Sequence, residues 1–391
     1  MDLPLAMACH RAPGDGWRRW LRLRPVVLGL AAVALAAAVI DLPAEHRDYV
    51  AARLLLDAVP HPPFHLPAPA ANRPLVRTID LGHGHAAIAT TASLDLPARG
   101  NRLPGIVIVV GAAPLGRHDP QVVQLARALV RAGRAVLVPD LALRASALSS
   151  ADLQRIAAAF DALAALPRVD PGRIGLLGVS WGGALAVVAA STAPLAAKVA
   201  FVATFGAFYD LADLAGAVVT GASVYHGQIV RWHTVPEAQA LVRSALLSRL
   251  TPGQASAVQA ALADPRALPT LPPAERAVVE LLTNQDPARV ARLAAGLPPS
   301  IQRVRQAFSP AFHVQGLRAP LLALHSTDDP AAPWTESALL VVAARAHDRG
   351  GAWLTLVHVF SHVTQNGSLV APSALLDDWR LVRYVAGLLQ R

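Results

Sequence analysis

The chain has 391 residues, of which 54% are apolar and 16% are charged, and its formal net charge is +9. An apolar fraction this high excludes a disordered protein and is typical of a protein associated with membranes. The arginines that carry the positive charge are scattered along the chain, which is unlike a nucleic-acid-binding patch, and we expect no nucleic-acid partner.

The N-terminal region has the pattern of an export signal or a membrane anchor. Five arginines precede an uncharged run over residues 25–40, and acidic residues follow it. The run is shorter than the ~20 residues that span a bilayer comfortably, although residues 20–23 extend it if the arginines snorkel. We expect a tail over residues 1–16 and an anchor or signal-like segment over residues 17–41. The arginine bias then places the rest of the chain outside the cytoplasm. A cleaved signal of a secreted protein and an apolar helix docked on a cytoplasmic protein are the alternatives.

The sequence does not suggest a cofactor or a metal site. Cys9 is the only cysteine, and no set of cysteines and histidines has metal-ligand spacing. No GxGxxG or GxxxxGKS/T loop follows a predicted strand, which disfavours dinucleotide and P-loop chemistry. We therefore expect no cofactor.

The pattern after the N-terminal region predicts an α/β fold. Residues 42–74 have the pattern of a helix followed by a Pro-rich linker, and the globular domain is expected over residues 75–391. Strands are expected over residues 76–81, 86–94, 105–110, 135–138, 173–177, 199–205, 320–324 and 354–360, and helices over residues 120–132, 151–165, 183–190, 336–347 and 375–389. This alternation predicts a mostly parallel sheet with helices on both faces.

The alternation of strands and helices stops between residues 207 and 310. Short helices are expected there over residues 236–250, 253–263, 273–282 and 287–293. Asp286 followed by Pro287 is a good start signal for the last of them, an N-cap residue followed by proline at the first helical position. We predict that residues 207–310 form a helical cap inserted over the sheet.

A serine lies between a predicted strand and a predicted helix. The motif Gly178-Val179-Ser180-Trp181-Gly182 follows the strand at residues 173–177 directly. A nucleophile elbow needs small residues on both sides because its serine occupies a sharp, strained turn. The bare motif arises often by chance, but this position between strand and helix predicts that Ser180 is a nucleophile.

A catalytic serine needs a histidine that accepts its proton and a carboxylate that orients the histidine. The strand at residues 320–324 is followed by a polar loop with Asp328 and Asp329, and the strand at residues 354–360 is followed by His362. The order serine, aspartate, histidine fits a hydrolase. Either aspartate can serve as the acid, since adjacent loop residues can exchange roles.

The elbow, the acid loop and His362, together with the strands that end near Gly111 and Asp140, resemble an α/β hydrolase of the serine-esterase or dienelactone-hydrolase kind. The resemblance covers residues 75–391. In that family the acid loop commonly contains His-Gly, two residues, Asp and a later proline. This register implies that Asp329 is the acid, with Pro333 at the proline position and Ser326 in place of the glycine. Dienelactone hydrolases proper have cysteine where this chain has Ser180.

The resemblance also implies an oxyanion hole made by two backbone N–H groups. Trp181, which follows the nucleophile, matches the first, and Ala112, in the loop after the strand at residues 105–110, matches the second. Family members often have His-Gly at the second place, whereas this chain has Val110-Gly111-Ala112-Ala113. The donor is a backbone group, so the missing histidine does not forbid the function.

The remaining histidines and aromatic residues have structural interpretations beside functional ones. His358 lies within a predicted strand, and a packing role is expected for it, as for His325 and His313. The side chains that either line a pocket under the cap or only pack there are Trp181, Tyr225, His226 and Trp232.

We expect the chain to hydrolyse a small-molecule substrate with an ester-like acyl bond, using Ser180, Asp329 and His362. Thioesterase, peptidase and acyltransferase activities are alternatives, because the same triad serves each of them. A membrane-tethered α/β protein that binds without turnover is the alternative from another class.

Overall fold

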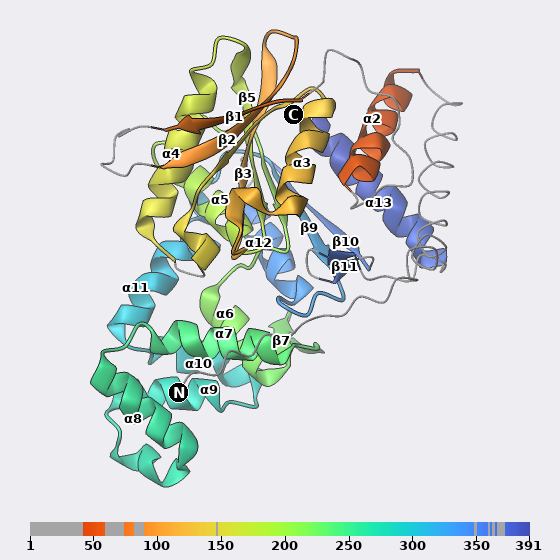
Figure 1. Ribbon diagram of the computed structural model, residues 1–391. Helices are drawn as coiled ribbons and strands as arrows, with labels where there is room; N and C mark the ends of the chain where they lie inside the picture. The colour runs from red at the N-terminus through yellow and green to blue at the C-terminus, as the bar shows by residue number, and fades with distance from the viewer. Residues whose placement is uncertain are drawn as a thin grey trace, which may run out of the picture.

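The computed structural model describes residues 42–58, 74–81, 90–145, 148–347, 350–358, 360–361, 364–365 and 372–391. Within these residues one eight-stranded sheet has the order β1-β2-β4-β3-β5-β6-β9-β10 (Figure 1). The strands are β1 Pro74–Asp80, β2 Thr91–Pro97, β3 Leu103–Val109, β4 Ala135–Pro139, β5 Val169–Val179, β6 Val202–Phe205, β9 Leu321–Ser326 and β10 Ala352–Val357. Strands β1 and β2 are antiparallel to their neighbours, and the strands β3, β4, β5, β6, β9 and β10 are parallel to one another. The predicted α/β-hydrolase architecture is confirmed.

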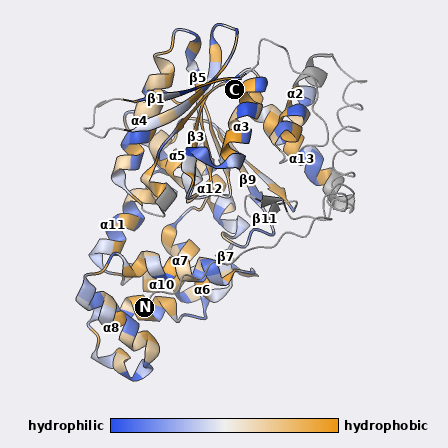
Figure 2. Cartoon of the chain, viewed as in Figure 1, coloured by the Kyte–Doolittle hydropathy of each residue, from blue (hydrophilic) through white to orange (hydrophobic). Residues whose placement is uncertain are grey.

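Helices cover both faces of this sheet. The helices α2 Leu42–Ala58, α3 Pro120–Arg131 and α13 Pro372–Leu389 contribute to one hydrophobic core, and α4 Ser150–Ala164, α5 Trp181–Ser191 and α12 Trp334–Ala346 contribute to the other. Strand β3 supplies both, since Ile106 and Ile108 belong to the first core and Val107 and Val109 to the second. Figure 2 shows hydrophobic and hydrophilic residues alternating around α2 and α3. This is the pattern expected of helices that cover a sheet.

Helix α2 packs as part of the hydrolase domain. Ala51 and Leu56 are buried in the core that α2 shares with α3 and α13. The Arg53 guanidinium donates to the carbonyl of Arg131 over 2.7 Å, and Gln124 Nε2 donates to the carbonyl of Asp57 over 3.0 Å. The domain core therefore includes residues that precede the boundary expected at residue 75.

The anchor or signal-like segment expected over residues 17–41 lies outside the described residues. The Pro-rich linker after residue 58 lies outside them as well. In the part of the chain that the structure describes, none of the helices has both the length and the apolar character needed to cross a membrane.

The insertion between β6 and β9 forms a cap with a core of its own. Its elements are α6 Leu211–Thr220, β7 Ala222–Tyr225, β8 Gln228–Arg231, α7 Pro236–Leu247, α8 Pro252–Ala263, α9 Pro273–Leu282, α10 Val290–Ala295 and α11 Pro299–Phe308. Val258, Val278 and Leu281 are buried among them. Figure 1 shows α7 to α10 as a layer beyond one edge of the sheet. Helix α6, the β7–β8 hairpin and α11 had no counterpart among the predicted elements.

Three ionisable side chains join the two ends of the cap to the core. The Arg305 guanidinium, on α11, contacts Asp210 at the start of α6, with Nε 2.8 Å from Oδ1. Glu336 on α12 is buried, and its Oε2 accepts the backbone N–H groups of Tyr209 at 2.8 Å and of Asp210 at 3.2 Å. The entrance, the exit and the neighbouring core helix are therefore held together.

The charge of Glu336 is expected to make this junction sensitive to pH. Burial raises its pKa from 4.5 to about 8, and the nearby Asp213 carboxylate adds to the rise. The folded protein therefore holds a proton that the unfolded chain releases above pH 4.5, so stability is lost as pH rises toward 8. Glu336→Gln keeps an acceptor oxygen without this proton. Across that window the free energy of unfolding of the wild type is expected to fall by ~5 kcal/mol relative to the variant.

Urea unfolding of both proteins at several pH values measures this difference. The matched control is Glu237→Gln, an exposed carboxylate in the first turn of α7. Parallel stability curves for the wild type and Glu336→Gln would contradict the role given to the buried proton.

Candidate active site

Ser180 occupies the turn between β5 and α5 in a strained conformation. Its φ is +55° and its ψ is −127°, a combination that residues with a side chain rarely adopt. Two backbone hydrogen bonds fix the turn: the Ser180 N–H donates to the Phe205 carbonyl over 2.7 Å, and the Gly183 N–H donates to the Ser180 carbonyl over 2.8 Å. The turn has the conformation of a nucleophile elbow.

The two flanking glycines are needed because backbone atoms crowd this turn. A Cβ atom on Gly182 would lie 2.1 Å from the carbonyl oxygen of Val109, and one on Gly178 would lie 2.4 Å from that of Gly182. Both distances are far below contact distance, and the neighbouring atoms are backbone that cannot swing aside. The sequence-based argument from small flanking residues therefore has a direct steric cause.

We expect Gly182→Ala to displace the elbow. Overpacking against backbone costs ~3 kcal/mol of unfolding free energy, and a displaced nucleophile lowers kcat/KM about 100-fold. Thermal unfolding and an activity assay measure the two effects. The control is Gly253→Ala in α8, where an added Cβ meets no atom within 4 Å. A Gly182→Ala protein as stable and active as the control would show that the elbow tolerates a side chain.

The loop after β3 lies against the elbow. A Cβ atom on Gly111 would lie 3.1 Å from Ser180 Cβ and 3.3 Å from the Trp181 nitrogen. The Ala113 N–H donates to the Gly111 carbonyl over 2.8 Å, so it is committed to the loop itself. The donor expected from this loop, the Ala112 N–H, stays a prediction. Trp181 is the first residue of α5, where an N–H has no acceptor within the helix.

The acid loop begins where β9 ends, at Ser326. Asp329 is 0% exposed, and its Oδ1 accepts the N–H groups of Ala331 at 2.8 Å and of Ala332 at 3.2 Å. Asp328 is exposed, and its Oδ1 accepts a long 3.4 Å contact from the Thr327 hydroxyl. Of the two aspartates that the sequence left open, Asp329 is the buried one whose carboxylate is held by backbone N–H groups, and its role as the acid stays a prediction.

His362 lies outside the described residues, so its position relative to Ser180 and Asp329 is not part of the description. The residues on either side, Ser361 and Thr364, pair in a short antiparallel ladder of β11 Phe360–Ser361 and β12 Thr364–Gln365. Strand β10 ends at Val357 beside the end of β9. The chain therefore leaves β10 at the edge of the sheet where the acid loop lies.

The cap contacts both loops of the site. Phe208, Leu214 and Ala332 form a small apolar cluster with Ala184 of α5, and Trp181 and Trp232 pack against it. The rings of Trp181 and Phe208 meet edge to face, with centroids 5.7 Å apart. Trp232 Nε1 donates to the carbonyl of Asp329 over 2.6 Å. The start of α5, next to Ser180, and the loop after β9 thus both pack against the cap.

Tyr225 and His226 stand at the end of strand β7. Their rings meet at 4.3 Å between centroids, and Tyr225 also meets Trp334, the first residue of α12, at 5.4 Å. His226 is exposed at the tip of the β7–β8 hairpin. These contacts tie the hairpin to the helix that follows the acid loop.

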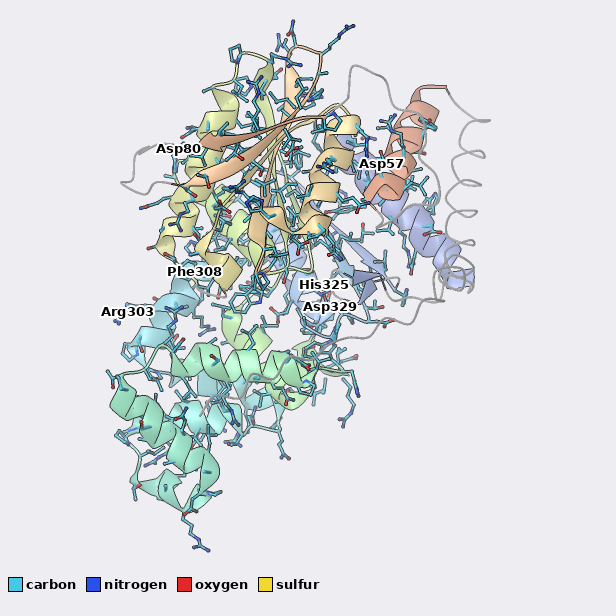
Figure 3. All side chains as sticks on the ribbon, viewed as in Figure 1. Asp57, Asp80, Arg303, Phe308, His325 and Asp329 are labelled. Atoms are coloured by element: carbon cyan, nitrogen blue, oxygen red, sulfur yellow. The ribbon has the colours of Figure 1, made fainter. Side chains whose placement is uncertain are left out.

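Three other histidines have defined partners. His358 is half-exposed, with Nδ1 3.2 Å from Asp377 Oδ2. The His313 Nε2 lies 2.7 Å from the Gln306 carbonyl. His325 is buried beside the acid, with Nε2 3.6 Å from Asp329 Oδ2 (Figure 3). Sequence reasoning gave His325 a packing role and missed this contact, although its spacing of four residues from Asp329 was a signal.

The parallel sheet, the strained serine turn after β5 and the acid loop after β9 define a serine hydrolase of the α/β-hydrolase superfamily. The family model of X-Pro dipeptidyl-peptidase (S15 family) matches residues 145–364, which is more than half of the chain. The chain belongs to this family. The match spans the elbow, the cap and the acid loop.

Solved structures with similar folds include peptidases and an esterase. The puromycin-hydrolyzing peptidase of Mycobacterium tuberculosis is 18% identical, with a TM-score of 0.49, over 82% of this chain and 39% of that one. The acylaminoacyl peptidase of Pyrococcus horikoshii is 15% identical, with a TM-score of 0.46, over 80% and 40%. The Pyrobaculum calidifontis esterase is 15% identical, with a TM-score of 0.46, over 89% and 94%. This chain therefore spans about 40% of the length of the two peptidases. None of the curated proteins matches the chain.

Proposed function

We propose that the chain hydrolyses an ester-like acyl bond through Ser180, Asp329 and His362. The observation that carries the proposal is the strained turn of Ser180 at the end of β5, with a buried, backbone-bound Asp329 at the end of β9. A serine held in such a strained backbone conformation at the end of a strand is more often functional than structural.

The proposed reaction is acyl transfer to water. Ser180 Oγ attacks the carbonyl carbon while His362 takes the hydroxyl proton. The N–H groups of Trp181 and Ala112 stabilise the oxyanion, and His362 then returns the proton to the leaving group. Asp329 stabilises the imidazolium. Water attacks the acyl-enzyme in the second half, with His362 again as base.

The surroundings of the nucleophile favour an uncharged acyl group. The partly buried Trp181 and Trp232 pack against the apolar cluster between the cap and the elbow. An apolar wall of this kind holds an aliphatic or aromatic acyl chain better than an ionised one. The substrate is therefore proposed to be a small neutral ester.

A peptidase is the second candidate, and the family match supports it. The same nucleophile, base and oxyanion hole serve amide and ester substrates. The kinship with dienelactone hydrolases that the sequence suggested stays a prediction within the same superfamily.

The discriminating experiment compares p-nitrophenyl butyrate with Ala-Pro-p-nitroanilide, together with labelling by a fluorophosphonate. We expect label on Ser180, located by mass spectrometry, and a kcat/KM for the ester at least about 100-fold above that for the anilide. The reverse order would make the protein a peptidase. A folded protein that takes no label and turns over neither substrate would be a binding protein rather than an enzyme.

We also propose that residues 17–41 tether the domain to a membrane, with the domain outside the cytoplasm. The support is the arginine-rich flank on the N-terminal side of an uncharged run. Protease digestion of intact cells should cleave the domain if the proposal holds. Recovery of an uncleaved, freely soluble protein after cell breakage would contradict it.

A further inference from the structure

His325 has hydrogen-bond contacts at Nδ1 and Nε2 that are both satisfied only when both ring nitrogens carry a proton. His325 is 0% exposed on β9. Its Nδ1 lies 2.7 Å from the hydroxyl oxygen of Ser337 on α12, and its Nε2 lies 3.0 Å from the carbonyl oxygen of Ala332 in the acid loop. The contacts therefore join a strand, a helix and a loop.

The hydrogens in this network can be assigned from what each partner can do. A carbonyl oxygen only accepts, so the contact with Ala332 requires a hydrogen on Nε2. The Ser337 hydroxyl donates its single hydrogen to the Ala207 carbonyl over 2.9 Å. Its oxygen is then an acceptor toward His325, so the Nδ1 contact requires a hydrogen on Nδ1 as well. A neutral ring with its hydrogen on Nε2 would take the Ser337 hydrogen and leave the Ser337 and Ala207 oxygens 2.9 Å apart without one between them. A neutral ring with its hydrogen on Nδ1 would leave Nε2 and the Ala332 oxygen 3.0 Å apart without one.

The counter-charge for an imidazolium is already in place. Asp329 Oδ2 lies 3.6 Å from His325 Nε2, and both side chains are fully buried. Figure 3 shows the two residues together at the edge of the sheet that faces the cap. A buried carboxylate is costly unless it is paired, and a buried imidazolium is costly for the same reason. Each charge therefore compensates the other.

The other charged groups of the elements packed around His325 have their own partners. Glu336, next to Ser337 on α12, accepts the N–H groups of Tyr209 and Asp210. The segment after β6 contributes the Ala207 carbonyl. Strand β10 pairs Leu356 with His325, and His358 beyond its end pairs with Asp377. Among the described residues, Asp329 is the charged group whose contact with His325 is established.

We propose that His325 is a positioning residue, a buried imidazolium that pairs with Asp329 and tunes the strength of the catalytic base through it. The proposal rests on the role given to Asp329 in the proposed function. A second positive charge next to Asp329 opposes the formation of an imidazolium at His362, so it lowers the pKa of that base. The enzyme then keeps a neutral base, and its activity, down to lower pH.

The kinetic test uses His325→Gln. Glutamine is neutral and keeps a donor for the Ala332 carbonyl. Without the cation, the acidic limb of the pH profile of kcat/KM is expected to move up by about one unit. Activity on the acidic limb then falls about tenfold, while the plateau at higher pH changes less than about twofold. A purely structural role would lower the plateau and leave the limb in place.

The matched control is His358→Gln, which removes a histidine that also pairs with an aspartate but is half-exposed. The acidic limb and the plateau of the pH profile of kcat/KM are expected to be the same in His358→Gln as in the wild type. A limb that stays at its wild-type pH in His325→Gln, or shifts equally in both variants, would overturn the proposal.

The protonation state itself is measured by nitrogen-15 NMR of histidine-labelled full chain, with the His325 signals assigned by their loss in His325→Gln. Two protonated ring nitrogens at about pH 7 are expected for His325. One protonated and one bare nitrogen would overturn the proposal. This readout is made on the wild type and needs no turnover, and His325→Asn supplies the assignment if His325→Gln fails to fold. Absence of fluorophosphonate labelling at Ser180 would instead defeat the proposed function, whatever charge His325 carries.

Discussion

Replacing Ser180 by alanine is expected to lower kcat/KM for an ester substrate by about 10⁴-fold or more, because the acyl-enzyme cannot form. The backbone of the elbow should persist, since its hydrogen bonds to Phe205 and Gly183 come from main-chain atoms. Alanine also tolerates the buried position. The melting temperature is therefore expected to stay close to that of the wild type, which separates loss of chemistry from loss of fold.

The control for this variant is Ser248→Ala. Ser248 follows α7 and donates only to the nearby Ala245 carbonyl, so its removal should leave activity within about twofold of the wild type. Steady-state assays with p-nitrophenyl butyrate and fluorophosphonate labelling measure both proteins. Undiminished turnover by a correctly folded Ser180→Ala protein would remove Ser180 from the mechanism.

Asp329→Asn is expected to have the second largest effect, a fall in kcat of about 10⁴-fold. Asparagine keeps an oxygen for the N–H groups of Ala331 and Ala332, so the loop can retain its shape. The charge that stabilises a protonated base is lost, however, and the amide can present its NH₂ group to the histidine and favour the wrong tautomer. Stopped-time assays at saturating substrate measure the fall in kcat.

The neighbouring residue supplies a control within the same loop. Asp328→Asn makes the same chemical change at an exposed position and is expected to alter kcat less than about twofold. A larger loss in Asp328→Asn than in Asp329→Asn would transfer the role of the acid to Asp328. Equal losses would show that the loop acts through its overall charge.

The sheet and the elbow could be predicted because their signals are local. Buried parallel strands appear as continuous apolar runs, and glycine on both sides of Ser180 satisfies a clash within the turn itself. The helix expected over residues 273–282 coincides with α9. The order of the strands in the sheet follows from general rules of connection rather than from any one residue.

Other parts of the molecule depend on contacts between distant residues. Helix α2 looked like a separate element because its partners, Gln124 and Arg131, lie on α3. The sequence did not separate Asp328 from Asp329 because both lie after the end of β9, where side chains no longer alternate between the two faces of the sheet. His325 resembled a core residue, since its contacts with Ser337 and Ala207 arise only in the folded chain. Local sequence patterns do not reveal contacts between residues that are far apart in the sequence.

The hydrogen bond from Trp232 to the Asp329 carbonyl has a consequence for how selectivity can change. The indole belongs to the residue that follows β8 in the cap, while the carbonyl belongs to the backbone of the acid loop, so the hydrogen bond couples the two parts. A substitution that reshapes the cap for a bulkier acyl chain also pulls on the acid. Substrate binding and turnover are then coupled. Variants selected for a new substrate should change in both KM and kcat, and not in either alone.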